Sequence, residues 1–492
     1  MDSKGVTIEY IDDAKPLDSL NSDLEKDFET IDPKIEAVIR RKYDKRILPI
    51  VTMVYLLAFI DRSNMGNAKQ LGMTEDLELY GNRFSITLTA FFITYVIFEV
   101  PTNILCKRFG PKIWLSLICF VFGFITLCLS FPNSYGGMVA ARAFLGVAEA
   151  GIMPAISYML STFYKRHELV TRVGIYASFA SLAGGFGGLL AIGLSKIPTW
   201  GIIHTWRNIF FFEGLLTMIA AVICYIYLPK SPETSPFLTE EEKRIGELRI
   251  RQETLTDNQN KLKKHHFKLA IMNLNTLLMS FGLMCSLLCM NSIALFMPSL
   301  LASMGFDTIH SQLMTVPPYA CGTVVCILLA MASDRFKVRG PILFCIAGPL
   351  IIIAFAILLT VEHTGVRYMA IFFATCGGFT GSPVFVAWGV DNNAGPMVRA
   401  ISSAYSISLG CLGGIISTWT YLPSEAPGYR VGHIINLCAG VVITITSLIA
   451  SLRYIYENKQ RDNGKRDHRL EGLSQEDIDE LGHTHPSFRF TP

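Results

Sequence analysis

The sequence predicts an all-α polytopic membrane protein whose twelve transmembrane helices form two six-helix bundles. Hydrophobic residues make up 51% of the 492 residues and charged residues only 17%. This composition is too apolar for a soluble globular protein. About twelve apolar stretches have the length, about twenty residues, that a helix needs to cross a bilayer. One long hydrophilic interruption divides these stretches into two sets of about equal number.

Each apolar stretch is predicted to be a helix. Backbone groups in lipid must find hydrogen-bond partners inside their own segment, and these stretches are too long and continuous for the strands of a barrel. To within several residues at each end, the predicted spans are 47–68, 84–106, 112–131, 137–160, 171–194, 207–228, 271–301, 313–333, 341–361, 366–389, 399–421 and 432–455.

The polar segments define the domain organisation. The acidic start of the chain has too little apolar surface to offset the entropy of ordering, so residues 1 to about 32 are expected to be disordered. No short apolar run lies near Met1, and we expect the first hydrophobic helix to direct insertion. The predicted units are an N-terminal tail (1–45), a first bundle (46–228), a linker (229–270), a second bundle (271–455) and a C-terminal tail (456–492).

The distribution of basic residues predicts the orientation. The run Arg40–Arg46 precedes the first span, and a basic stretch lies in the 229–270 linker. Lys and Arg accumulate in cytoplasmic loops, so both termini and the linker are expected in the cytoplasm. The loops Lys107–Pro111 and Asp334–Pro341 follow the second and eighth spans and resemble each other, which favours two repeated bundles.

Four charges inside predicted spans are the strongest candidates for a functional site. Asp61 and Arg62 lie in the first span, and Arg142 and Glu149 lie in the fourth. Ionisable residues at that depth are costly and usually mark a substrate or proton path. At a rise of about 1.5 Å per residue, Asp61 and Arg142 share one level and Arg62 can reach Glu149. We expect the four side chains to surround one water-filled hollow near mid-membrane.

These residue types suit coupled binding of an anion and a proton. Arginine stays charged and offers a planar fork that matches a carboxylate. Protonation of Asp61 or Glu149 would release its arginine, so that Arg62 and Arg142 could bind the carboxylate of a substrate. The alternative is that the four residues only hold the bundle together as buried ion pairs. Such pairs add little net stability, which favours a functional role.

Other candidates rest on weaker signals. Glu99 beside Pro101, and the loop residues, are expected to have structural or gating roles. Packing or helix capping is the favoured explanation for each polar candidate in the second half, although amides and aromatic rings can also line a binding cavity. The candidates for gating or structure are Glu99, Arg108, Asp334 and Arg335, and those for substrate binding in the second half are Asn291, Tyr319, Asn393 and Tyr405.

Several motifs together resemble a known family. The chain is similar to the anion:cation symporter family of the major facilitator superfamily, and in particular to fungal allantoate and nicotinate permease-like transporters. The matching motifs are 61–68, 99–103, 142–151, 164–166 and 421–427. The resemblance implies the major facilitator fold. It also implies that Asp61, Arg62, Arg142 and Glu149 correspond to charges that related bacterial sugar-acid symporters use.

The function expected from these observations is proton-coupled uptake of a small organic carboxylate, such as nicotinate, allantoate or another vitamin- or sugar-acid-like anion. Two alternatives stay open: proton-antiport efflux of a metabolite or toxin, and a nutrient-sensing receptor with weak transport. No motif indicates an enzyme, a cofactor, a metal site or nucleic-acid binding. We expect a monomer in the plasma membrane whose partners are the anion, protons and lipid.

Overall fold

The computed structural model describes the chain except residues 1–31, 258–268, 337, 395 and 471–481. The expectation of disorder for the first residues therefore lies outside the described part of the chain. The long helices are α2 (Pro33–Arg46), α3 (Leu48–Ala68), α5 (Arg83–Phe109), α6 (Pro111–Cys128), α7 (Tyr135–Glu149), α8 (Ile152–Ser161), α9 (Arg166–Ser195), α10 (Thr205–Tyr227), α11 (Glu240–Asp257), α13 (Leu274–Ser303), α15 (Val316–Phe336), α17 (Gly348–Thr360), α18 (Thr364–Asp391), α19 (Pro396–Ser417) and α20 (Arg430–Asp462).

Short helices fill the connections between the long ones. They are η1 (Lys69–Met73), α4 (Thr74–Asp76), α14 (Thr308–Leu313), α16 (Gly340–Ile342), η2 (Leu343–Ala347), η3 (Pro423–Glu425), η4 (Asp467–Leu470) and η5 (Gly482–Thr484).

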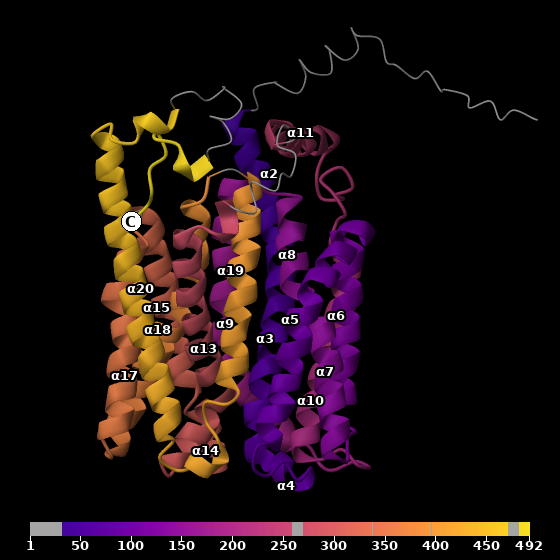
Figure 1. The fold of residues 1–492 in the computed structure, drawn as a ribbon. Helices are drawn as coiled ribbons and strands as arrows, with labels where there is room; N and C mark the ends of the chain where they lie inside the picture. Colours follow the sequence, from indigo (N-terminus) through magenta and orange to yellow (C-terminus); the bar gives the residue numbers. More distant parts are fainter. Residues whose placement is uncertain (1–31, 258–268, 337, 395, 471–481) are drawn as a thin grey trace, which may run out of the picture.

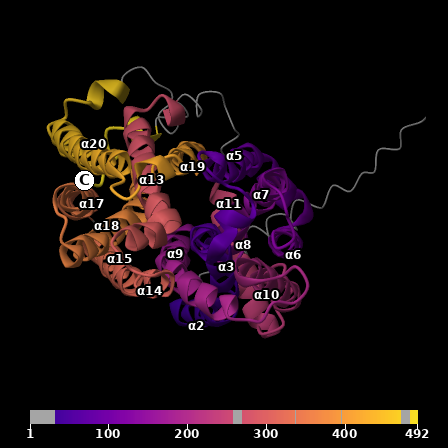
Figure 2. The same ribbon diagram turned by 90° about the horizontal axis from the view of Figure 1, so that it is seen from below.

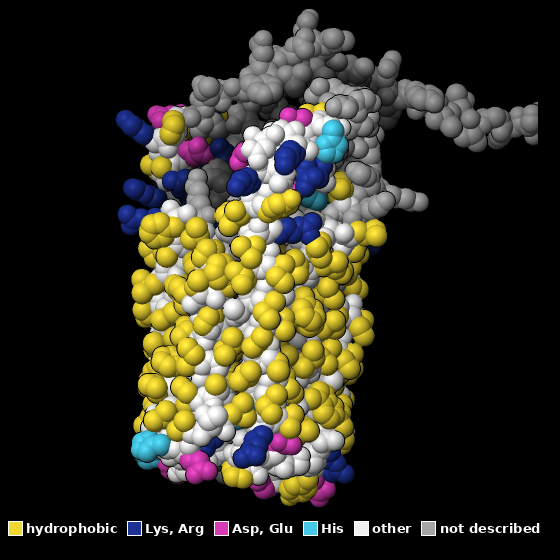
Figure 3. Space-filling view, turned by 60° about the vertical axis from the view of Figure 1, so that its left-hand side comes forward, with side chains coloured by type: hydrophobic (Ala, Val, Ile, Leu, Met, Phe, Trp, Pro, Cys, Tyr) yellow, Lys and Arg dark blue, Asp and Glu magenta, His cyan; other side chains and the backbone are white. Residues whose placement is uncertain are grey.

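The described residues form a multi-pass helical membrane protein. Eleven helical segments are long and apolar enough to cross a membrane, and α19 adds a shorter apolar segment, Ile401–Ser417. Figure 3 shows hydrophobic side chains covering the middle of one face, with charged side chains confined to its two ends. Each predicted span is therefore helical, although the fourth falls on two consecutive helices and the ninth on three, and the predicted fold class is confirmed.

The helices gather in two sets. Figures 1 and 2 show α3–α10 on one side of the molecule and α13–α20 on the other. The contacts between the two sets include those of α3 with α13, α9 with α15, and α5 with α19. Gly66 makes one of these contacts possible, because a Cβ atom there would lie 2.2 Å from the carbonyl oxygen of Leu295. The centre of the molecule is thus a seam between two helical sets.

The two ends of the bundle differ. We call the end that carries α2, α11 and residues 482–492 the tail end, and the opposite end, with α4 and α14, the far end (Figure 1). At the far end, side chains of the two sets bond directly: Gln70 donates to Ser299 at 3.0 Å and Thr89 lies 2.8 Å from Thr418. The aromatic rings of Phe84 and Phe296 also meet across this end. The seam is therefore closed by direct contacts at the far end.

The first tail contains a helix, α2, that the sequence analysis did not predict. Asp32 caps the start of α2, and Pro33 fits its first turn because the amide hydrogen missing there is not needed. This helix packs against α11 of the linker, where Lys42 bonds Glu242 at 2.6 Å. Burial alone would raise the pKa of Glu242, but hydrogen bonds from Lys42 and Thr239 outweigh that effect and lower it.

A buried carboxylate ties this tail helix and the linker to α9. Glu168 of α9 accepts from Arg249 of α11 at 2.7 Å and from Arg40 of α2 at 3.1 Å. Arg249 also bonds Glu36 at 2.9 Å. The linker helix is thus fixed to the first helical set at the tail end.

Candidate functional site

The first buried ion pair joins α3 to α7. Arg142 Nη1 lies 3.0 Å from Asp61 Oδ2, and both side chains are sealed from solvent. Thr126 of α6 donates to the other carboxylate oxygen at 3.4 Å. We call these two charged residues the deep pair.

The second ion pair uses the next residue of α3. Arg62 Nε lies 2.6 Å from Glu149 Oε1, and 19% of the Arg62 side chain is exposed. The guanidinium also lies 5.0 Å from the ring centre of Tyr95 and 5.8 Å from that of Phe59. We call Arg62 and Glu149 the rim pair. Both pairings are those that helical rise predicts.

Local packing places α7 so that both pairs can form. A Cβ atom at Gly146 would lie 2.3 Å from the carbonyl oxygen of Phe91, so glycine lets α7 approach α5 closely. Thr94 of α5 fixes the contact by donating to the carbonyl oxygen of Ala143 at 2.8 Å. Arg142 and Glu149 lie two turns apart and share one face of α7, which this packing turns toward α3.

The predicted fourth span is broken in the middle. It consists of α7, which ends at Glu149, and α8, which begins at Ile152. Pro154 lacks an amide hydrogen and its ring crowds the preceding turn, which explains a break at this point. Glu149 is therefore the last residue of α7, and Ala150 and Gly151 separate it from α8.

The structure differs from the expectation of one hollow that all four charges share. Arg62 is partly exposed, whereas Asp61, Arg142 and Glu149 are each at most 2% exposed. The ring of Phe91 accounts for this difference in exposure, because it lies 5.4 Å from the guanidinium of Arg142 and 5.8 Å from that of Arg62. Of these four side chains, Arg62 alone is partly exposed.

A third buried acid completes the region, and the sequence analysis missed it. Glu213 of α10 is 4% exposed, and its carboxylate accepts a hydrogen bond from the side-chain amide of Asn64. Gly214 brings α10 close to α6, since a Cβ atom there would lie 2.4 Å from the backbone nitrogen of Leu127. The signal was present in the sequence: Glu213 is the one acidic residue in the predicted span 207–228.

Two candidates of the second half lie near the seam. Tyr319 of α15 packs on Gly184 of α9, and Ser181 donates to its carbonyl oxygen at 3.0 Å. Asn291 is 5% exposed and donates to the carbonyl oxygen of Leu287 one turn earlier. Tyr319 thus lies at the contact between the helical sets, and Asn291 is satisfied within its own helix.

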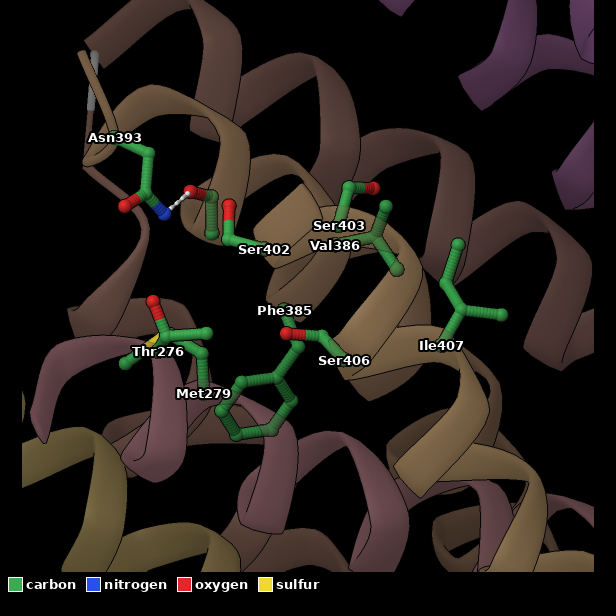
Figure 4. Close-up of a pocket in the computed structure, with 10 residues that line it drawn as sticks. Thr276, Met279, Phe385, Val386, Asn393, Ser402, Ser403, Ser406 and Ile407 are labelled. Atoms are coloured by element: carbon green, nitrogen blue, oxygen red, sulfur yellow. Dashed lines mark hydrogen bonds between the residues drawn. The ribbon is translucent and has the colours of Figure 1, made fainter. Parts of the chain in front are cut away.

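Asn393 lies in a different place from the charges. It lines a small pocket that Figure 4 shows between α13, α18 and α19, together with Thr276, Ser402 and Ser406. Its amide donates to the carbonyl oxygen of Gly389 at 2.8 Å, as expected of a residue at a helix end. Tyr405 lies on α19 and is half-buried.

Of the gating candidates, Glu99 lies near enough to Arg62 for their charges to interact, and the other three lie at the ends of α5 and α15. Glu99 is half-buried, and its Oε2 atom has no hydrogen-bond partner among the described residues. Arg108 and Arg335 are exposed, and the side chain of Asp334 lies outside the described residues. An ion pair that the sequence analysis did not name, Arg339 with Asp391 at 3.0 Å, joins the loop before α16 to the end of α18.

Five ionisable side chains on three helices make up the charge of this region. The described residues contain no group of three His, Cys, Asp or Glu side chains placed to hold a metal ion. Two guanidiniums and three carboxyl groups on α3, α7 and α10 instead form a compact charged region surrounded by apolar packing. Such a region in a helical membrane protein is typical of a transport path.

Comparison with known proteins identifies the family. The family model described as Major Facilitator Superfamily matches residues 51–418. The chain belongs to this superfamily and is a membrane transporter rather than an enzyme.

Relatives in fungi extend over most of the chain. An uncharacterized transporter of Schizosaccharomyces pombe, C1039.04, is 32% identical over 463 residues, which cover 94% of this chain and 91% of that protein. The MFS-type transporter efuF of Hormonema carpetanum is 33% identical and covers 88% of each chain. The major facilitator-type transporter hxnP of Emericella nidulans is 31% identical, covering 89% of this chain and 90% of that one.

Solved structures share the fold. A D-xylose–proton symporter matches with a TM-score of 0.64 at 16% identity, covering 83% of this chain and 97% of that chain. A bacterial homologue of the human lysosomal transporter Spinster also has a TM-score of 0.64, at 14% identity, and covers 86% and 97%. At these identities the likeness concerns the fold.

Proposed function

We propose that the chain is a proton-coupled symporter of the anion:cation symporter branch that takes up a small organic carboxylate by alternating access. The observation that carries this proposal is the rim pair: Arg62 is bonded to a buried carboxylate and is also partly exposed. A guanidinium in this position can exchange an internal carboxylate for that of a substrate.

The two pairs would supply the coupling. A proton on Glu149 removes the charge that holds Arg62, and the freed guanidinium binds the incoming carboxylate. A proton on Asp61 would release Arg142 in the same way. Because each buried arginine needs a negative partner, substrate and proton bind together or leave together. Nicotinate, allantoate or another vitamin- or sugar-acid-like anion fits such a site.

The closed far end supports an assignment of direction. Side-chain contacts join the helical sets there, so this structure would represent the form open at the tail end. With both termini in the cytoplasm and the chain a monomer in the plasma membrane, that form would release substrate into the cell. Outward opening would require the far-end contacts to separate.

An uptake assay tests the proposal. Cells that express the protein should accumulate a labelled carboxylate faster as the external pH falls, and a protonophore should abolish accumulation. A competition panel of nicotinate, allantoate, pantothenate and sugar acids identifies the preferred anion. Uptake that is indifferent to both pH and protonophore would refute proton coupling, and faster loss of preloaded substrate would indicate efflux instead.

A further inference from the structure

Glu213 is a buried acid for which the ion pairs described above provide no cation. Within the described part of the chain it forms no ion pair, and its Oε1 atom has no hydrogen-bond partner. The charged groups that act on it most are Asp61 and Arg142 of the deep pair. Two carboxyl groups therefore share the surroundings of one guanidinium.

Among the other helices packed against α10, α3 brings Arg62 to this depth, but Arg62 is already paired with Glu149. Gly187 of α9 lies beside Ser63 and Asn64, whereas Arg172 of α9 lies roughly 22 Å away along that helix. Arg172 is already paired with Asp44 at 2.7 Å. Helix α6 contributes the neutral Thr126 and the thiol of Cys119.

The other nearby basic groups have contacts of their own at the far end. Lys69 of η1 lies over the rings of Phe84 and Phe296, and Arg207 of α10 donates to the carbonyl oxygen of Ser130 at 2.9 Å. Arg142 is therefore the cation available to both Asp61 and Glu213.

Charge balance then requires a proton. With both acids ionised, the region around Arg142 would carry one uncompensated negative charge, and an unpaired buried charge costs several kcal/mol, on the order of the penalty for breaking a buried pair. One proton removes that charge. A protonated Glu213 would also have an O–H group to donate.

The neighbouring amide offers an acceptor for that hydrogen. Asn64 Oδ1 is buried without a donor, on the side chain that already contacts Glu213. The oxygen and nitrogen of an amide exchange places by a turn about its last bond. A turned Asn64 would therefore accept the hydrogen of a protonated Glu213.

We propose that Asp61 and Glu213 hold one proton between them and share the guanidinium of Arg142, which makes Glu213 an additional proton-binding residue. When Arg142 pairs with Asp61, as in this structure, the proton resides on Glu213. If Arg142 turned to Glu213, the proton would reside on Asp61. Loss of the proton would leave two negative carboxylates holding Arg142, which would keep it from a substrate anion.

Infrared spectroscopy of the full-length protein in lipid tests the protonation directly. The wild type should show the C=O stretching band of a protonated carboxyl group near neutral pH. Glu213→Gln should remove this contribution. Asp61→Asn should remove it too, because Arg142 is then free to pair with Glu213 and ionise it. Glu362→Gln, which alters an exposed acid, should leave the band intact.

Each other outcome overturns the proposal. A band that survives Glu213→Gln shows that the protonated group lies elsewhere. A band that is lost in Glu213→Gln but kept in Asp61→Asn shows that Glu213 is neutral for structural reasons and shares nothing with Asp61. If Glu213→Gln does not fold, Glu213→Asp keeps an acid and should move the band, and an unmoved band refutes the assignment.

The effect on binding, unlike the infrared band, rests on the proposed function. The affinity of the wild type for the carboxylate should fall as the pH rises. Glu213→Gln should remove the part of this decline that loss of the shared proton causes, and should leave the part that loss of the proton from Glu149 causes. A structural role alone would leave the pH profile unchanged in shape. If the wild type binds no carboxylate, the proposed function fails while the infrared result still decides where the proton lies.

Discussion

The deep pair and the rim pair are built from the same residue types on the same two helices, yet their surroundings differ. Asp61 and Arg142 are sealed among α3, α6, α7 and α10. Arg62 lies over the rings of Phe91 and Tyr95 and is partly exposed, although its partner Glu149 is buried. In the proposed mechanism, the deep pair would keep charge and proton in balance, and the rim pair would meet the substrate.

This difference shows that neighbouring charges need not share a role. Asp61 and Arg62 are adjacent in sequence, but adjacent residues on a helix point about 100° apart. One side chain therefore faces the interior of the first helical set and the other faces its rim. Substitutions in the two pairs should differ in how strongly they affect folding and binding.

The largest effect is expected for Arg142→Gln. Removing one partner of a buried ion pair leaves the other charge uncompensated and costs about 3–5 kcal/mol. Both thermal stability in detergent and uptake should fall sharply. The double variant Asp61→Asn with Arg142→Gln, which leaves no uncompensated charge in the pair, should recover stability but not uptake. A double variant as unstable as Arg142→Gln would show that the pair itself is not the cause.

A smaller effect on stability is expected for Arg62→Gln. The variant loses a hydrogen bond between charged groups, which is worth about 1.5–3 kcal/mol, and its partly exposed site can admit water. Binding of the carboxylate should nevertheless be lost, as measured by substrate-induced thermal stabilisation. Arg62→Lys keeps the charge but lacks the planar fork, so it should fold and bind weakly. If Arg62→Gln bound the carboxylate with full affinity, Arg62 would not be a substrate-binding residue.

Glu149→Gln should separate binding from coupling. The amide mimics the protonated acid, so Arg62 is permanently released and the variant should bind substrate and exchange it across proteoliposome membranes. Accumulation driven by a pH gradient should disappear, because no proton can be taken up at this position. Concentrative uptake by Glu149→Gln would contradict the role proposed for the rim pair.

The sequence predicts those parts of this site that depend on single helices. Apolar length locates the spans, and helical rise pairs Asp61 with Arg142 and Arg62 with Glu149. Apolar length and helical rise do not predict the contacts of Glu213, because its neighbours depend on how closely α10 approaches α6 at Gly214. Its presence in an apolar span was visible, but the identity of its partner was not.

The position of the Phe91 ring between the two pairs could not be predicted from the sequence either. One ring, Phe91, separates the guanidiniums of Arg142 and Arg62, and nothing in its own surroundings along the chain distinguishes it from other apolar residues. The break between α7 and α8 had a visible cause in Pro154, but prolines also occur inside the unbroken helices α5, α13 and α18. Tertiary packing therefore decided both features.

The smallest effect on stability is expected for Phe91→Leu. This variant tests whether one ring causes the difference between the deep pair and the rim pair. The substitution keeps an apolar side chain and should cost about 1 kcal/mol, a typical value for a single change. It removes the ring that covers both guanidiniums, so water can reach the deep pair and Asp61 can exchange protons with the rim directly. The two pairs should then titrate together, and the pH profile of uptake should become broader.

Phe98→Leu is the matched control, because it alters an exposed ring on the same helix, and it should leave the pH profile of uptake unchanged. An unchanged pH profile in Phe91→Leu would mean that backbone packing, rather than this ring, keeps the two pairs apart.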